Sequence, residues 1–120
     1  MEFRTRQLVK PDDLNASNTL FGGRLLAWMD EEAAIFCMVK LEQHNIVTAY
    51  MSSVTFESKA HQGDIIEIGA EVLRYGRTSI AIRCHARNQT THKPILTIEE
   101  MVFVCVDDEG NPKPHGKTAS

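Results

Sequence analysis

The sequence predicts an α+β domain in which an antiparallel sheet of five or so strands curls around one long helix. Residues 22–41 provide the first observation, a largely apolar run of helical length. The second is a series of later segments rich in Val, Ile, Thr and aromatic residues, separated by short breaks that contain Gly, Asn, Asp or Pro. Because the helix and these strands occupy separate parts of the chain, the pattern is typical of an α+β fold.

The elements can be placed in order along the chain. A first strand is expected near residues 3–9, before the helix. The later strands are expected over residues 46–56, 64–73, 78–86 and 95–106, with connections short enough for hairpins. Residues 111–120 are mostly Pro, Lys and small residues, so we expect a flexible tail unless they dock on a neighbour or ligand. Residues 1–110 are expected to form a single domain.

Asp30 is the most unusual residue of the predicted helix. The run from Leu25 to Val39 leaves hardly any polar face, so we expect other structure to wrap the helix and bury this carboxylate. Unpaired buried carboxylates are rare because desolvating the charge is expensive. Asp30 is therefore a candidate catalytic acid, and a structural salt bridge is the alternative.

The start of the helix carries a second candidate feature. Asn18 and Thr19 precede it as capping residues, and Gly22 and Gly23 stand in its first turn. Glycine in a helix costs roughly 1 kcal/mol relative to Ala, so helix formation does not explain the pair. It does let another molecule approach the first-turn N–H groups, which lie at the positive end of the helix dipole and suit an oxyanion. The alternative is close packing of this backbone against a strand.

Several short motifs occur in order between about Gln7 and Asp108. They are Asn15 followed by Phe21-Gly22-Gly23, then Met29-Asp30, Val47-Thr48, Gly63-Asp64 and Gly76-Arg77-Thr78-Ser79. Together they resemble the hotdog-fold acyl-CoA thioesterases, specifically the bacterial and mammalian cytosolic acyl-CoA hydrolase branch. One departure is Ser17-Asn18, where that family often has a small residue and Gly.

The resemblance implies a hotdog fold and hydrolysis of acyl-CoA thioesters to free fatty acid and CoA. It implies that Asp30 is the catalytic acid and that Asn15 completes the site. The Gly22 and Gly23 amides, with the Asn15 side chain, are candidates for the oxyanion hole. Asp30 could serve either as general base or as nucleophile, and the sequence leaves both open. No cofactor is expected, because coenzyme A is part of the substrate.

Spacing and resemblance both predict an oligomer. Gly22 and Asp30 are eight residues apart, which is roughly 12 Å along a helix axis, so both can hardly reach one carbonyl group. Two helices antiparallel across a two-fold axis would bring each N-terminus to the partner's Asp30. The resembled thioesterases work as dimers, and many assemble further into hexamers.

The CoA phosphates and the acyl chain need further groups. Candidates for the phosphates are Arg74 and Arg77, with Thr78 and Ser79 as hydrogen-bonding neighbours and with Lys59 and Lys93 as additional cations. For each basic residue, a solvated surface charge is the alternative. The acyl chain is expected to pass Trp28, Met29 or Phe56, which could equally be core residues.

Composition argues against several other functions. The net charge of −3 and the pI near 5.9 disfavour nucleic-acid binding. The histidines are scattered without metal-ligand spacing, and no G-x-S-x-G elbow is present. The charged N-terminal residues lack the apolar region of a signal peptide, and the acids at 30–32 disfavour a membrane span. Three cysteines without a C-x-x-C pair are expected to be reduced and packed in the core of a cytoplasmic protein.

Two other functions compete with hydrolysis. A hotdog hydratase or dehydratase would need a catalytic His opposite the acid, and the predicted helix contains none. A non-catalytic acyl-CoA-binding module is the other alternative, because a fold does not determine its function. Asp30 and Asn15 argue against a module that only binds.

Overall fold

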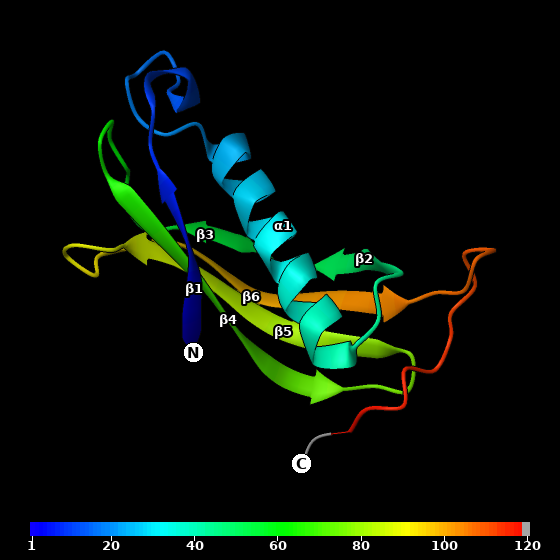
Figure 1. Cartoon of the computed structure of the whole chain (residues 1–120). Coiled ribbons are helices and arrows are strands. Elements are labelled where there is room, and N and C mark those ends of the chain that lie inside the picture. The colour runs from blue at the N-terminus through cyan, green and yellow to red at the C-terminus, as the bar shows by residue number, and fades with distance from the viewer. Residues whose placement is uncertain (119–120) are drawn as a thin grey trace.

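One helix lies across one face of a curved antiparallel sheet in the computed structural model, which describes residues 1–118 (Figure 1). The elements in chain order are β1 (Glu2–Leu8), a short 3₁₀ helix (Pro11–Asp13), α1 (Gly22–Leu41), β2 (Ile46–Met51), β3 (Val54–Phe56), β4 (Ile65–Tyr75), β5 (Ser79–Asn88) and β6 (Pro94–Cys105). The helix has the predicted bounds, and the α+β arrangement of one long helix on an antiparallel sheet is confirmed.

The sheet has the strand order β1-β4-β5-β6-β2, and β3 also pairs with β6, so β1 and β2 lie at opposite edges. The strand expected over residues 46–56 is divided at Ser52 and Ser53, which gives six strands. The Ser52 N–H donates to the Glu100 carbonyl (2.8 Å), and the Glu100 N–H donates to Ser52 Oγ (3.0 Å). This serine therefore keeps the edge attached to β6 while the chain bends.

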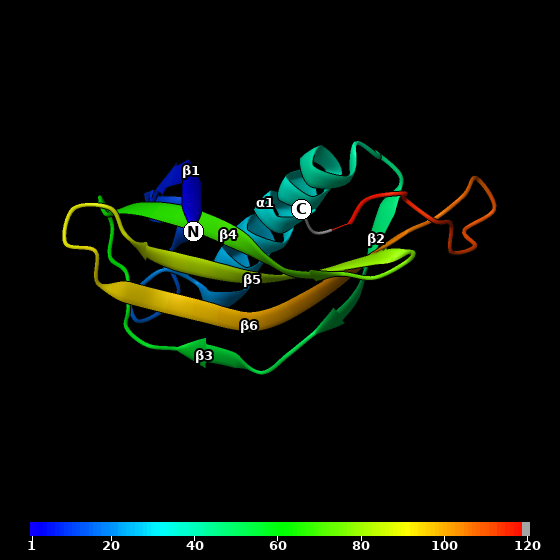
Figure 2. The same cartoon turned by 90° about the horizontal axis from the view of Figure 1, so that it is seen from below.

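The core lies between α1 and the face of the sheet beneath it (Figure 2). The helix contributes a stripe of buried residues four positions apart, namely Leu25, Met29, Ala33, Cys37 and Leu41. The two central hairpin strands contribute alternate residues, namely Ile66, Ile68, Ile80, Ile82 and Cys84. This alternation follows from strand geometry, in which successive side chains point to opposite faces.

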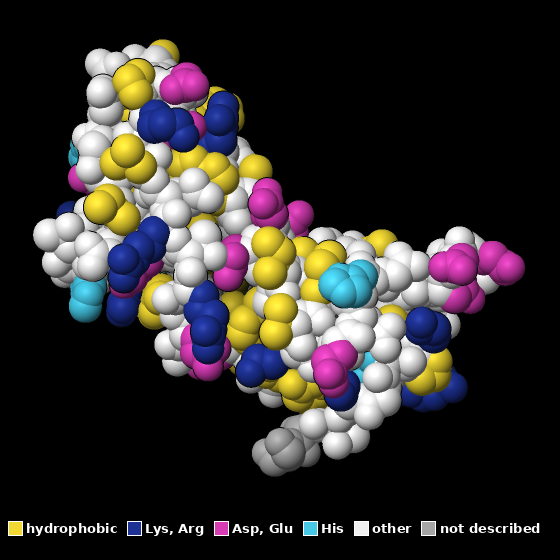
Figure 3. Space-filling model, in the orientation of Figure 1, with side chains coloured by type: hydrophobic (Ala, Val, Ile, Leu, Met, Phe, Trp, Pro, Cys, Tyr) yellow, Lys and Arg dark blue, Asp and Glu magenta, His cyan; other side chains and the backbone are white. Residues whose placement is uncertain are grey.

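Only one side of α1 is covered, which corrects the expectation that other structure wraps it. Ile35 and Val39 are 47% and 70% exposed, and hydrophobic side chains are visible over the helix in Figure 3. The reason is that the single sheet packs against one side, and no further layer within residues 1–118 covers the other. An open apolar face of this kind is typical of an interaction surface. In this same part of the chain, no helix is long and apolar enough to cross a membrane.

The three cysteines are packed inside the domain, as predicted. All are buried and free. Burial raises the pKa of the Cys37 and Cys84 thiols to about 12. Both thiols are therefore protonated at neutral pH and behave as small apolar side chains.

The C-terminal segment lies on the domain, although the sequence predicts a flexible tail from residue 111. Pro112 forms a β-bridge with Val106, and the Lys113 N–H donates to the Cys105 carbonyl (2.8 Å). The side chain of His115 is buried in the same segment. These contacts order the backbone of residues 112–115, although the composition of this segment is typical of a flexible one. Residues 119 and 120 of the predicted tail lie outside the described residues.

Candidate active site

The N-terminal end of α1 opens into a largely apolar pocket. Its lining includes Asn15, Gly22, Leu25, Phe56 and Lys59. A Cβ atom at Gly22 would lie 3.2 Å from the Phe56 ring, which is closer than most side-chain contacts. Glycine at this position therefore keeps space between the helix backbone and the aromatic ring, and leaves the backbone accessible from the pocket.

The first turn of α1 begins without a capping side chain. Phe21 is the N-cap residue, and its side chain makes no capping hydrogen bond. The expectation that Asn18 or Thr19 caps the helix is wrong, because both residues belong to the preceding loop. The amides of Gly22 and Gly23 have no acceptor among the residues that the structure describes. Two N–H groups at the positive end of the helix are thus available to a carbonyl oxygen.

Asn15 organises the loop that leads into the helix. Its Oδ1 accepts hydrogen bonds from the N–H groups of Ser17 (2.9 Å) and Thr19 (3.1 Å). Its Nδ2 donates to Thr19 Oγ1 at 3.0 Å. This turn places Asn18 in the left-handed region with φ 61°. Asn adopts that conformation more readily than most residues, which explains how it replaces the glycine of the resembled family.

Asp13 is a buried carboxylate next to the start of α1 that the sequence pattern does not reveal. Its side chain is 2% exposed, and its carboxylate accepts from the Lys10 N–H (2.8 Å) and from Arg24 Nη1 (3.1 Å). Its backbone carbonyl accepts from the Phe21 N–H (2.9 Å). Asp13 therefore ties the loop to the first turn of α1. Periodicity gives no signal for the ion pair, because the two charged residues lie eleven positions apart in different elements.

Asp30 lies in the middle of α1 and faces β2. Its Oδ1 accepts a hydrogen bond from Thr48 Oγ1 at 3.1 Å. The sequence predicts a buried carboxylate, but Asp30 is only half-buried, because the helix side beside β2 is uncovered in the single protomer. Thr48 fixes the carboxylate while its other oxygen remains able to accept a proton.

The candidate catalytic groups do not meet within one protomer. Gly22, Gly23 and Asn15 gather at the N-terminal end of the helix, whereas Asp30 is eight residues from Gly22, roughly 12 Å along the axis. Asp30 does not line the pocket that contains Gly22.

The candidate CoA-binding residues lie at a third place, the turn between β4 and β5 near the C-terminal end of α1 (Figure 1). Arg74 forms an ion pair with Glu100, so its charge is already matched. Arg77 is exposed and has no ion-pair partner among residues 1–118. Thr78 and Ser79 follow in the same turn. Of the candidate CoA residues in this region, Arg77 has the cation most available to a phosphate.

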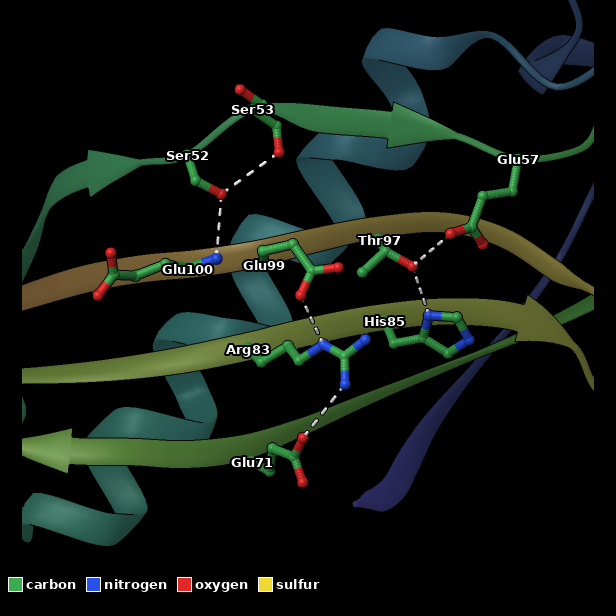
Figure 4. A network of polar contacts seen from close by, with 9 residues as sticks. All are labelled: Ser52, Ser53, Glu57, Glu71, Arg83, His85, Thr97, Glu99 and Glu100. Carbon is green, nitrogen blue, oxygen red and sulfur yellow. Dashed lines mark hydrogen bonds and ion pairs between the residues drawn. The ribbon is translucent and has the colours of Figure 1, made fainter.

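The opposite face of the sheet carries a separate polar network (Figure 4). Arg83 forms ion pairs with Glu71 (3.6 Å) and Glu99 (3.1 Å), the second without hydrogen-bond geometry. His85 Nδ1 lies 2.8 Å from Thr97 Oγ1. Burial is the largest cause that lowers the pKa of His85, which therefore stays neutral at pH 7. The network covers the face away from α1, so this histidine is remote from Asp30.

Known proteins resemble this chain in sequence and in fold. The family model described as the thioesterase superfamily matches residues 17–95. The acyl-CoA thioester hydrolase YciA of Salmonella typhimurium is 30% identical over 94% of this chain and 89% of its own. A hexameric thioesterase from Yersinia pestis has a TM-score of 0.86 and 27% identity, covering 99% of this chain and 96% of its own.

A further solved structure carries ligands. The acyl-CoA hydrolase of Staphylococcus aureus, in complex with butyryl coenzyme A, coenzyme A and coenzyme A disulfide, has a TM-score of 0.82 and 35% identity. That match covers 92% of this chain and 66% of the S. aureus protein. On the strength of the family match and these relatives, the chain belongs to the thioesterase superfamily, among the hotdog-fold acyl-CoA thioester hydrolases.

Proposed function

We propose that the protein hydrolyses acyl-CoA thioesters to CoA and a carboxylic acid, at a site that two protomers share. The observation that carries this proposal is a complementary pair of half-sites. One is the Asp30 carboxylate bound by Thr48, and the other is the pair of unpaired amides at Gly22 and Gly23 beside an apolar pocket. Two antiparallel helices would bring the half-sites of different protomers together.

The two half-sites supply what thioester hydrolysis needs. Attack on the carbonyl carbon places negative charge on its oxygen, and each preorganised amide donor there is worth ~10²–10³ in rate. In one route, Asp30 takes the proton of the attacking water, the C–S bond breaks, and the CoA thiolate leaves and is protonated. In the other, the Asp30 carboxylate attacks the carbonyl carbon, the C–S bond breaks and the CoA thiolate leaves and is protonated. Water then hydrolyses the mixed anhydride, which releases the carboxylic acid and restores the Asp30 carboxylate. Neither route uses a metal or a further cofactor.

An open edge and an open helix face support the dimer. β2 is an edge strand, and its Val47 and Tyr50 are 47% and 52% exposed. Helical spacing places Gly23, Ala27 and Ala34 on the same side of α1 as Asp30, and their small side chains permit close approach of a partner.

Two solved relatives are described as hexameric. One is the Yersinia pestis thioesterase, and the other is an acyl-CoA thioesterase that is 40% identical over 92% of this chain and 72% of its own, with a TM-score of 0.78. By analogy with them, we propose that dimers of this protein assemble into a hexamer.

The alternatives are less well supported. The pocket at the helix N-terminus has no histidine in its described lining, which disfavours a hydratase or dehydratase. A module that only binds acyl-CoA would not need a general base or nucleophile, whereas Asp30 is held in place for such a role by its hydrogen bond from Thr48. The S. aureus acyl-CoA hydrolase has been characterised as two mutants, one with an Asp replaced by Ala and one with a Thr replaced by Ala. An Asp and a Thr are also the two residue types that form the hydrogen bond between Asp30 and Thr48 in this chain.

The function can be tested with the purified full-length protein and a series of acyl-CoA substrates of increasing acyl length. We expect the rate of free CoA thiol release to saturate with substrate concentration. The acyl lengths at which kcat/KM is highest define the substrate preference. Binding of acyl-CoA without thiol release would identify a binding module. Conversion of enoyl-CoA to hydroxyacyl-CoA without thiol release would identify a hydratase.

The dimer predicts a linked loss of assembly and activity. Val47→Asp places a charge on the exposed edge strand β2, and we expect the native mass to fall toward the 13.5 kDa of one protomer while activity falls in parallel. Native mass spectrometry and the thiol assay measure both. Leu8→Asp is the matched control, because Leu8 is a similarly exposed apolar residue (52%) on the opposite edge strand. A monomeric Val47→Asp protein with full activity would contradict a shared site.

A further inference from the structure

His115 is the most deeply buried residue of the C-terminal segment, with 5% of its surface exposed. Its Nε2 lies 2.8 Å from the Ser79 carbonyl oxygen, and its Nδ1 lies 3.0 Å from the Lys117 N–H. A carbonyl oxygen can only accept and an N–H can only donate, so Nε2 donates to the Ser79 carbonyl and Nδ1 accepts from the Lys117 N–H. The ring also packs edge-on against Tyr75, with centroids 6.2 Å apart. These partners fix the position and orientation of the imidazole.

The turn between β4 and β5 is closed within its own hairpin by a bond from the Gly76 N–H to the Ser79 carbonyl (2.9 Å), and further bonds reach it from outside the hairpin. The His115 N–H donates to the Arg77 carbonyl (3.3 Å), and the Cys105 N–H donates to the Thr78 carbonyl (2.8 Å). With the bond from His115 Nε2 to Ser79, three successive carbonyls of the turn are held by the end of β6 and the C-terminal segment. The backbone that presents the Arg77 side chain is therefore fixed from outside its own hairpin.

A pocket lies between this turn and the C-terminal segment. Its lining includes Tyr75, Arg77, Pro114, Gly116 and Lys117. Arg77 gives this pocket a guanidinium with no ion-pair partner among residues 1–118, and a guanidinium can bind a phosphate group through two parallel hydrogen bonds.

The charges around the pocket suit an anion, and the distance from the pocket to Asp30 suits the length of CoA. Lys117 forms an ion pair with Glu42, so these two charges match each other and Arg77 is left as the cation that a phosphate would meet. Asp30 and Leu41 are eleven residues apart, so the pocket at this end of α1 is separated from the candidate acid by roughly 16 Å along the axis. CoA carries its thioester and its nucleotide phosphates at opposite ends of an extended arm, which fits such a separation.

We propose that His115 is a positioning residue for the nucleotide end of the substrate: it holds the Ser79 carbonyl from the C-terminal segment and so keeps Arg77 placed for a CoA phosphate. This inference rests on the proposed acyl-CoA hydrolase function. His115 itself touches no substrate in this account. It acts through the turn, and its removal should affect binding of the nucleotide and leave the chemistry at Asp30 intact.

The test compares two substrates with the same acyl group, acyl-CoA and acyl-pantetheine, which lacks the nucleotide. We expect His115→Ala to raise KM for acyl-CoA about tenfold with kcat nearly unchanged, because one buried hydrogen bond that positions a charged contact is lost. KM for acyl-pantetheine should not change. His115→Gln, whose amide can still reach the Ser79 carbonyl, should recover much of the loss. Lys113→Ala is the control, because this exposed residue of the same segment uses only its backbone amide.

A double mutant separates the inference from the function on which it rests. If His115 acts through Arg77, then Arg77→Ala alone should raise KM for acyl-CoA, and adding His115→Ala should raise it little further. A large effect of Arg77→Ala with no effect of His115→Ala or His115→Gln overturns the role of His115 alone. Equal impairment on acyl-CoA and acyl-pantetheine overturns it as well, because the residue is then merely structural. Absence of thiol release from acyl-CoA by the unmodified protein overturns the proposed function itself.

Discussion

Asp30→Asn is expected to lower kcat for acyl-CoA hydrolysis by ~10²–10⁴, the usual contribution of a general base, while the protein stays folded. The substitution keeps the size of the side chain and its ability to accept the hydrogen bond from Thr48. It removes the charge that either takes a proton from water or attacks the carbonyl. Steady-state kinetics and thermal unfolding measured on the same preparation check both parts of this expectation.

The matched control is Glu31→Gln, which neutralises the adjacent acid on an exposed side of the same helix. Its kcat should stay close to that of the unmodified protein, because the Glu31 side chain has no role in the proposed chemistry. If Asp30→Asn retains near-normal turnover in a folded protein, Asp30 is not the catalytic acid. If both variants lose activity equally, the cause is the charge of the helix surface and not a specific carboxylate.

The bounds of α1 could be predicted from the sequence because its twenty residues, which begin with the Gly pair, are largely apolar and are followed by a polar stretch. The later strands can be predicted for a similar reason, since Gly, Pro and Asn breaks separate them. The division at Ser52 and Ser53 could not be predicted. Nothing in the local pattern shows that a serine side chain will bond to the backbone of β6.

The extent of helix burial could not be predicted from one protomer. Hydrophobicity reports which surfaces avoid water, and it does not distinguish a surface covered within the same protomer from one covered by a partner. Ile35 and Val39 are apolar and yet exposed in the single protomer. The half-burial of Asp30 has the same cause, since the side of α1 next to β2 is open in the single protomer.

The local geometry of the site could be predicted only in part. The sequence indicates the accessible amides at Gly22 and Gly23, but it also suggests caps at Asn18 and Thr19 that the structure does not contain. The side-chain hydrogen bonds between Asn15 and Thr19 determine the conformation of the loop before α1. They belong to a turn, so helix periodicity does not predict them. The docking of the C-terminal segment could not be predicted, because it depends on backbone bonds of Pro112, Lys113 and His115 and on burial of the His115 ring, which composition does not indicate.

Complementation by mixing is the second large effect that we expect. Gly22→Val should fill the space between the first turn and the Phe56 ring, which blocks the amides of the helix N-terminus. Asp30→Asn and Gly22→Val are each expected to be inactive alone. In a dimer that contains one protomer of each kind, one site carries both substitutions and is inactive. The other site combines Asp30 of the Gly22→Val protomer with Gly22 of the Asp30→Asn protomer and is intact.

The most direct test of the shared site is therefore the activity of the two inactive proteins after subunit exchange, with exchange verified by native mass spectrometry of differently tagged protomers. Random exchange should restore about a quarter of the specific activity of the unmodified protein, because about half of the dimers are mixed and each has one intact site of two. Activity should rise with the measured fraction of mixed dimers. No recovery despite complete exchange would contradict the account, since it would place Asp30 and the helix N-terminus of the same protomer in one site.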